Sequence, residues 1–218
     1  MTDPPGRAGA APSRVPRVGV LALQGDFGAH ARLIRALGAE PVEVRTAPDL
    51  EDLDGLILPG GESTVMALGI EREGLERPLR ALAAAGTPVF GTCAGLIMLD
   101  REHLDVLDVV ARRNAFGRQI RSFEADLDVA GLDGGPVRGV FIRAPWVEQH
   151  GEAVEVLAAL DGHPVAVRQR DLMAVAFHPE LAGDTRLHEL FLAAVRRRMS
   201  DETPVARKAG VDSLRKGQ

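Results

Sequence analysis

The sequence predicts a three-layer α/β protein, with helices on both faces of a doubly wound, mixed and mostly parallel sheet. Short apolar runs alternate with segments of helical periodicity through the first half of the chain, which is typical of strands that pair in parallel. From about 118 to 177 the chain instead contains several strand-like segments broken by Gly, Asp and Pro. These later strands make the predicted sheet mixed.

Four apolar runs are the predicted strands of the first half. They are RVGVLAL at 17–23, the segment 41–45, GLIL at 55–58 and PVFG at 88–91. Each is short, and its side chains are apolar enough to be covered on both faces of a sheet. We therefore expect four buried strands.

Helical periodicity separates these runs and returns at the end of the chain. Phe27, Ala31, Ile34 and Leu37 recur at helical spacing before Gly38, and the alanine-rich segment 75–85 stops at a glycine. Asp184 is placed to open a final helix. Its apolar side would consist of Leu187, Leu190, Phe191, Ala194 and Val195.

Length and composition indicate one compact domain, because 218 residues with 45% hydrophobic side chains can bury a substantial core. We expect the domain to span 17–199, between an N-terminal extension, 1–16, and a C-terminal tail, 200–218, both expected to be disordered or mobile.

Charge and hydropathy argue against two classes of partner. A formal net charge of -5 gives no basic surface for nucleic acid or for an acidic membrane. No apolar run approaches the roughly 18 residues of a membrane span, and the N-terminus lacks the apolar block of a secretory signal. We therefore expect a cytoplasmic protein that binds neither nucleic acid nor membrane.

Cys93 is the chain's single cysteine and lies where a strand should turn sharply into a helix. Gly91 and Gly95 flank it in the pattern G-x-C-x-G, the cysteine form of a nucleophile elbow. A helix N-terminus at this point would favour thiolate over thiol. The alternative is an inert cysteine that closes a core strand.

A thiol nucleophile needs a base and a group that orients the base. His178 and Glu180 fit, because residues i and i+2 of an extended segment project to one face, and the intervening Pro179 is rigid. HPE could also be a plain turn at a strand end. The other histidines are expected to be solvated or structural, and they are His30, His103, His150, His163 and His188.

Gly60 and Gly61 follow the strand-like run LIL, at the edge where α/β sheets bind ligands. Backbone N–H groups in such turns can stabilise an oxyanion, and Gly61 with Ala94 is the predicted donor pair. Ser63 is expected to cap the helix that follows. A Gly-Gly pair by itself is more often a plain turn.

These segments together resemble the class I glutamine amidotransferases, whose Cys-His-Glu triad lies on a nucleophile elbow and an HPE segment. Within that class the chain is similar to the PdxT/SNO family, the glutaminase subunits of pyridoxal 5'-phosphate synthase. The resemblance spans Val18 to about Arg197. Its segments are LQGDFGAH (23–30), LILPGGES (56–63), FGTCAGLI (90–97), RNAFGRQ (113–119), SFEADL (122–127), GVFIRAP (139–145) and FHPEL (177–181).

The resemblance implies a flavodoxin-like fold and a catalytic triad of Cys93, His178 and Glu180. It implies hydrolysis of L-glutamine to glutamate and ammonia through a glutamyl thioester, with no metal or organic cofactor. Ammonia would pass to a barrel-shaped partner, the synthase subunit PdxS. The implied contacts to glutamine are Gly60, Gly61, Glu62, Arg113, Ile142 and Arg143.

Three alternatives remain open from the sequence. The chain could be a glutaminase for another pathway, such as histidine or anthranilate biosynthesis, although RNAFGRQ and FIRAP argue against this. It could be a cysteine peptidase that shares the elbow, or a non-catalytic subunit that regulates the synthase. The segment 100–110 is shorter than the family pattern, which leaves the contact with the synthase less defined than the chemistry.

Overall fold

The computed structural model describes residues 14–117 and 122–202. Most of the expected N-terminal extension and C-terminal tail lies outside these residues. At the first described residue, the Arg14 guanidinium donates to both carboxylate oxygens of Asp54 at 2.6 and 2.7 Å. The last helix continues to Glu202.

The central sheet has seven strands in the order β2-β1-β3-β4-β11-β10-β9. The first five run parallel, and β10 and β9 are added antiparallel at one edge. Its strands are β1 (Arg17–Leu21), β2 (Glu40–Val44), β3 (Gly55–Leu58), β4 (Val89–Thr92), β9 (Glu155–Leu160), β10 (His163–Gln169) and β11 (Leu172–Val175). This arrangement confirms the predicted mixed, mostly parallel sheet.

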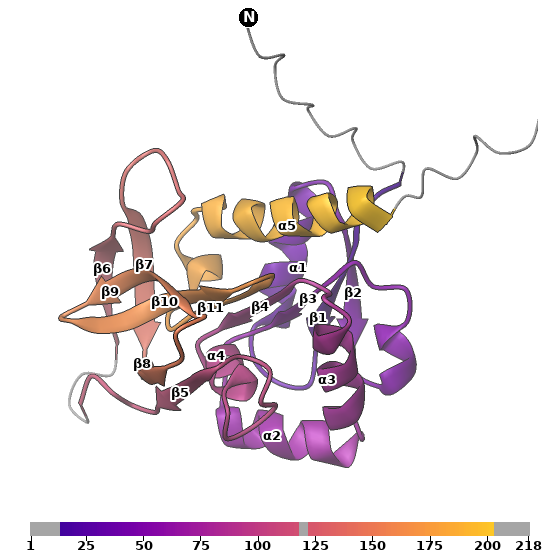
Figure 1. Ribbon diagram of the computed structural model, residues 1–218, viewed down its shortest axis with the longest axis horizontal. Helices are drawn as coiled ribbons and strands as arrows, with labels where there is room; N and C mark the ends of the chain where they lie inside the picture. The colour runs from indigo at the N-terminus through magenta and orange to yellow at the C-terminus, as the bar shows by residue number, and fades with distance from the viewer. Residues whose placement is uncertain (1–13, 118–121, 203–218) are drawn as a thin grey trace, which may run out of the picture.

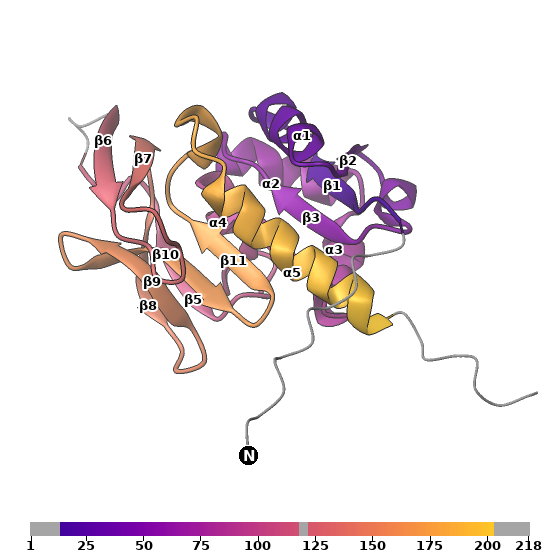
Figure 2. The ribbon, with the colours of Figure 1, turned by 90° about the horizontal axis from the view of Figure 1, so that it is seen from above.

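Helices cover both faces of the sheet, which gives the predicted three layers. One face carries α1 and α5, and the other carries α2, α3 and α4 (Figures 1 and 2). The helices are α1 (Phe27–Ala36), α2 (Ser63–Arg72), α3 (Glu76–Ala84), α4 (Ala94–Leu99) and α5 (Arg186–Glu202), with a short 3-10 helix η1 (Ala47–Leu50) after β2.

The strand-rich part of the chain forms two antiparallel ribbons beside the β9 edge of the sheet (Figure 1). One ribbon pairs β5 (Val109–Arg112) with β8 (Trp146–His150). The other pairs β6 (Ser122–Leu127) with β7 (Val137–Ile142). Strands β6 to β11 lie within the predicted strand-rich region, 118–177, but β5 precedes that region and was not predicted. The sequence also did not show that β5 to β8 are separate from the main sheet.

One strand is not buried as predicted. In β2 only Val44 is buried, and Glu40 and Glu43 are exposed. The reason is its position, because β2 forms the edge of the sheet and pairs only with β1 in the described part of the chain. An edge strand needs far fewer apolar side chains than a central one.

The cap of α2 also differs from the prediction. Glu62, not Ser63, is the N-cap, and its carboxylate accepts from the N–H groups of Thr64 at 3.1 Å and Val65 at 2.8 Å. Ser63 is the first helical residue and is buried. A carboxylate can satisfy two of the free N–H groups of the first turn, which a hydroxyl does less well.

The final helix has the predicted amphipathic character. The Asp184 carboxylate accepts from the Arg186 N–H at 3.0 Å where α5 begins. Leu187, Phe191 and Val195 are buried against the sheet. No helix among the described residues is both long and apolar enough to cross a membrane.

Two glycines of the turn between β4 and α4 are packed against backbone. A Cβ on Gly95 would collide with the Leu58 carbonyl oxygen of β3, and a Cβ on Gly91 would lie 2.8 Å from the Gly95 carbonyl carbon. Backbone atoms at these positions cannot move aside as the end of a flexible side chain can. The helix can therefore approach the sheet only because both residues lack a side chain.

We expect Gly95→Ala to lower the free energy of unfolding by about 1–3 kcal/mol, because the added methyl group overpacks a site closed by backbone. Gly28→Ala is the matched control, since its Cβ would have ordinary contacts, the nearest at 3.6 Å. Urea denaturation of both variants measures the difference. Equal stability of the two variants would contradict the close packing of α4 on β3.

Candidate active site

The candidate site lies at the edge where the parallel strands β1, β3, β4 and β11 end. Gln24, Gly61, Cys93 and His178 follow these four strands in turn. Carboxyl ends of parallel strands meet at one edge, which is where open α/β sheets bind ligands. A cavity of about 240 Å³ opens there, lined by Gln24, Gly61, Glu62, Ser63, Cys93, Ala94, Ile97, Arg113, Asn114, Ile142, Arg143 and His178.

Cys93 has the strained backbone that the G-x-C-x-G spacing predicts. Its φ is 47° and its ψ is -102°, which is rare for any residue with a side chain. Its N–H donates to the Val175 carbonyl of β11 at 2.8 Å, and its carbonyl accepts from the Leu96 N–H at 3.1 Å. Sheet and helix thus hold the turn from both sides, and Sγ lies 3.9 Å from the Ile142 carbonyl oxygen.

His178 and Glu180 meet as predicted, but not through an extended backbone. Pro179–Leu181 forms a 3-10 turn, η2, directly after His178. The turn brings His178 Nδ1 to 2.7 Å from Glu180 Oε1. Both side chains are largely covered, with 12% of His178 and 1% of Glu180 exposed. With Nδ1 bound to the carboxylate, Nε2 is the nitrogen left for another partner.

The surroundings of His178 favour its protonated form. Burial lowers the pKa of His178, but hydrogen bonds and charge interactions with Cys93 and Glu180 outweigh burial and raise it from 6.5 to about 10. Cys93 follows β4, and Glu180 lies in the 3-10 turn that follows the neighbouring strand, β11. The His178 imidazole therefore keeps its proton while it lies beside the Cys93 sulfur.

The two predicted oxyanion donors are near this pair and are free to donate. Ala94 is the first residue of α4, so its N–H has no acceptor within the helix. Gly61 has a φ of 154°, and its N–H makes no hydrogen bond within the described residues. A Cβ on Gly60 would collide with the His178 ring and lie 3.3 Å from Cys93 Cβ.

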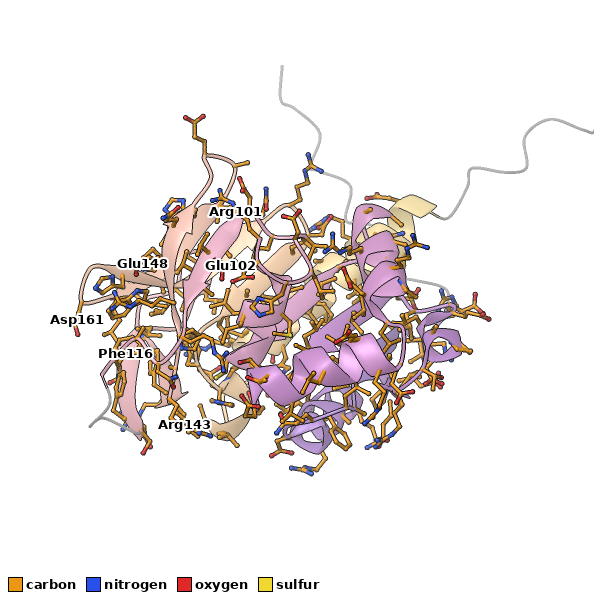
Figure 3. All side chains as sticks on the ribbon, turned by 90° about the horizontal axis from the view of Figure 1, so that it is seen from below. Arg101, Glu102, Phe116, Arg143, Glu148 and Asp161 are labelled. Carbon is orange, nitrogen blue, oxygen red and sulfur yellow. The ribbon has the colours of Figure 1, made fainter. Side chains whose placement is uncertain are left out.

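Five of the six predicted glutamine contacts line the cavity, and Gly60 does not. Arg113 donates to Glu62 Oε1 at 3.4 Å and to Thr64 Oγ1 at 3.2 Å, so it reaches α2 from the end of β5. Arg143 has a left-handed backbone, with a φ of 45°. It lies between the small ribbons and the helices of the main sheet (Figure 3).

The turn that carries Arg113 is anchored by one aromatic side chain. The Phe116 ring, labelled in Figure 3, packs at 5.0–5.5 Å between ring centroids against Phe123, Phe141 and Trp146. The neighbouring Ala115 N–H donates to the Ala144 carbonyl at 3.1 Å. These contacts join β6, β7 and β8 to the turn and fix the position of Arg113 beside α2.

Sequence reasoning missed Gln24, which completes the glycine turn. Its Oε1 accepts from the Glu62 N–H at 2.7 Å, and it occupies the space where Gly61 would carry a Cβ. The contact joins the end of β1 to the turn after β3. Gln24 follows directly on a predicted strand, and this position is the signal that could have identified it.

His30 and His188 were expected to be solvated or structural, and sequence reasoning did not identify their contacts near Glu180. Both are fully buried, and His30 Nε2 lies 3.4 Å from Glu180 Oε2. His30 Nδ1 lies 2.9 Å from His188 Nε2. Each lies on the apolar side of its helix, and a titratable group at such a position needs a partner inside the protein. That pattern was visible in the sequence.

Solved structures show which class of protein has this fold. A crystal structure of a glutamine amidotransferase is 49% identical, with a TM-score of 0.77, and the match covers 82% of this chain and 98% of that one. A glutamine amidotransferase from Thermotoga maritima has the same fold at 13% identity, with a TM-score of 0.58 and coverage of 86% and 99%. The fold is that of the glutamine amidotransferases.

The model of the SNO glutamine amidotransferase family matches residues 20–197, and the chain belongs to this family. Two relatives are called pyridoxal 5'-phosphate synthase subunit PdxT. The protein from Frankia alni is 57% identical over 190 residues, which are 83% of this chain and 96% of the relative. The protein from Nocardia farcinica is 52% identical over 210 residues, which are 90% and 92%.

We expect His178→Asn to flatten the dependence of stability on pH between 6.5 and about 10. A histidine whose folded pKa is raised binds more protons in the folded state, so its contribution is complete below pH 6.5 and is lost as the pH rises toward 10. Urea denaturation at several pH values, with Cys93 kept reduced, measures this. If the free energy of unfolding changed with pH in the same way for the variant and the unmodified protein, the raised pKa of His178 would be contradicted.

Proposed function

We propose that this chain hydrolyses L-glutamine to L-glutamate and ammonia with Cys93 as nucleophile, and that it passes the ammonia to the synthase subunit of pyridoxal 5'-phosphate synthase, PdxS. The observation that carries the proposal is the meeting of a strained, buried cysteine with a histidine that a buried carboxylate holds at 2.7 Å, at the floor of one cavity. A nucleophile, a base and an orienting group are what covalent hydrolysis of an amide needs.

In the first half of the reaction His178 holds the thiol proton and the Cys93 thiolate attacks the side-chain amide carbon of glutamine. The C–N bond breaks, and His178 gives the proton to the leaving nitrogen, which departs as ammonia. A γ-glutamyl thioester on Cys93 remains. Glu180 keeps His178 in the tautomer and orientation that this transfer needs, because it accepts from Nδ1.

The second half releases glutamate. Water enters the cavity, His178 takes one of its protons, and the oxygen attacks the thioester carbonyl. The C–S bond breaks, and the thiolate is restored. Both steps put negative charge on the same carbonyl oxygen, and the free N–H groups of Gly61 and Ala94 are our donors for it.

Recognition of glutamine is assigned to the charged and polar rim of the cavity. Arg113 is the proposed partner of the substrate carboxylate, because a guanidinium can bind two oxygens at once. Glu62, about two-fifths of whose side chain is exposed, is the proposed partner of the substrate ammonium. Gly61, Ile142 and Arg143 would bound the side-chain end of glutamine. Gly60, which does not line the cavity, lies against His178 and Cys93.

The pairing with PdxS is supported by the names of relatives at 51–57% identity, which are called subunits of pyridoxal 5'-phosphate synthase. Ammonia is useful to a synthase only while it is unprotonated, so the two proteins must be docked during turnover. We place this reaction in the cytoplasm, because reducing conditions keep Cys93 a free thiol. No cofactor takes part in the proposed steps.

The alternatives differ in what they require of the site. A glutaminase for another synthase would use the same triad and would release glutamate without responding to PdxS. A peptidase would cleave peptides and would not need Arg113 beside Glu62. A regulatory subunit would not need the Cys93 thiol. Assays with glutamine, peptides and PdxS separate these functions.

We expect Cys93→Ala to lower glutamate release in the presence of PdxS by about three orders of magnitude or more, because it removes the nucleophile. The measurement is glutamate formed from glutamine by the complex. Two measurements show whether the variant is folded, its binding to PdxS and its circular dichroism spectrum. A variant that binds PdxS and still hydrolyses glutamine at the original rate would show that another group is the nucleophile.

We expect Arg113→Ala to raise the KM for glutamine about ten- to a hundred-fold, because a charged hydrogen bond to the substrate carboxylate is lost. Arg112→Ala is the matched control. Its guanidinium lies 5.5 Å from the Trp146 ring and 3.7 Å from Glu148, and it does not line the cavity. If the two variants changed KM equally, the assignment of Arg113 would fail.

A further inference from the structure

The second oxygen of the Glu180 carboxylate faces a buried histidine, His30, which contacts a second buried histidine, His188. The proposed reaction uses neither histidine. His30 comes from α1 and His188 from α5, the two helices that cover the same face of the sheet (Figure 2). Glu180 Oε1 is taken by His178. Glu180 Oε2 is buried and makes no hydrogen bond of standard geometry within the described residues, and His30 Nε2 at 3.4 Å is its ion-pair contact.

Both imidazoles are neutral near pH 7. Burial lowers the pKa of His30 to about 4, against the attraction of Glu180 and together with the repulsion of His188 and His178. Burial likewise lowers the pKa of His188 to about 4. Each ring therefore carries one N–H, and the two rings must share their donors and acceptors in one of two ways.

The carboxylate selects between the two arrangements. If His30 is protonated at Nε2, it presents a donor to Glu180 Oε2 and to Thr92 Oγ1, 3.3 Å away, and its Nδ1 accepts from His188 Nε2–H. If His30 is protonated at Nδ1 instead, a lone pair faces the carboxylate. His188 Nδ1, which has no partner within the described residues, would then carry a buried N–H without an acceptor.

We propose that His30 and His188 are positioning residues for the hydrolysis of glutamine, and that they form a neutral chain of donors, His188 to His30 to Glu180. The chain fixes the orientation of the Glu180 side chain, with one oxygen toward His30 and the other toward His178. The inference rests on the proposed function, because it acts through Glu180 on the base of the triad. It adds two residues behind the triad, one from each helix of that face.

The protonation pattern is measured directly in the unmodified protein. With histidine labelled by 15N, long-range nitrogen–proton spectra at pH 7 distinguish the protonated ring nitrogen of each residue. The expected result is a proton on Nε2 of both His30 and His188. A proton on Nδ1 of His30, or a charged His30 ring, would overturn the proposal whatever the activity.

The kinetic test uses the complex with PdxS and compares His30→Leu with His30→Gln. Leucine removes the donor, and we expect kcat to fall about ten- to a hundred-fold, as for loss of a hydrogen bond to a charged group, with KM changed less than about two-fold. Glutamine places an N–H close to the position of Nε2 and should restore most of kcat. His188→Leu and His188→Gln should follow the same order with smaller effects.

A double-mutant cycle with Glu180→Gln separates positioning from general damage to the fold. If His30 acts through the carboxylate, His30→Leu lowers kcat further by less than about two-fold once Glu180→Gln is present. The proposal would be overturned if His30→Leu lowered kcat by the same factor with and without Glu180→Gln. It would also be overturned if His30→Leu alone left kcat unchanged. His103→Leu is the control, because it removes a histidine contact with another buried carboxylate, Asp100, at 2.8 Å and away from the cavity.

Failure of this inference and failure of the proposed function give different results. If the unmodified complex released no glutamate, or if Glu180→Gln left kcat unchanged, the proposed triad would be wrong. If both behaved as expected and only the histidine variants failed to respond, the triad would stand without the chain of donors. Should His30→Leu not fold, the spectra of the unmodified protein and the His188 variants still decide.

Discussion

The arrangement of the site depends on the left-handed backbone of Cys93. This conformation is unfavourable for a residue with a side chain, and it is held by a hydrogen bond to β11 on one side and by the first turn of α4 on the other. The turn is possible because Gly91 and Gly95 let α4 approach β3 and β4 closely. Asn114 and Arg143, which also line the cavity, have a positive φ as well. Three residues of the cavity lining therefore have a backbone conformation that is unfavourable for a residue with a side chain.

The polar groups around the site form two connected sets, one partly exposed at Glu62 and one buried at Glu180. Glu62 caps α2, receives the Arg113 guanidinium and is held through its own N–H by Gln24. Glu180 is shared by His178 and His30. A buried carboxylate is costly unless donors surround it. The sheet supplies the donors, because side chains that follow different strands lie close together at one edge.

The sequence predicted what depends on local pattern, and it failed where distant segments meet. Apolar runs that alternate with helical segments predicted the sheet and its layers, and the pattern G-x-C-x-G predicted the turn at Cys93. His178 and Glu180 were paired from their spacing, although the backbone between them is a 3-10 turn because Pro179 starts one. The contact of His30 with His188 depends on how α1 and α5 lie on the sheet. That arrangement is set by the whole core, so no segment taken alone reveals it.

The single cysteine of the chain has a consequence for its fate under oxidative stress. The thiolate of a cysteine is the form that peroxides attack, and the first product is a sulfenic acid. Many redox-tolerant proteins trap that product as a disulfide with a second cysteine. This chain has none to offer, so repair would depend on a small external thiol reaching a side chain that is only 5% exposed. Occupancy of the cavity by substrate would shield the sulfur, and the idle protein would then be the vulnerable one.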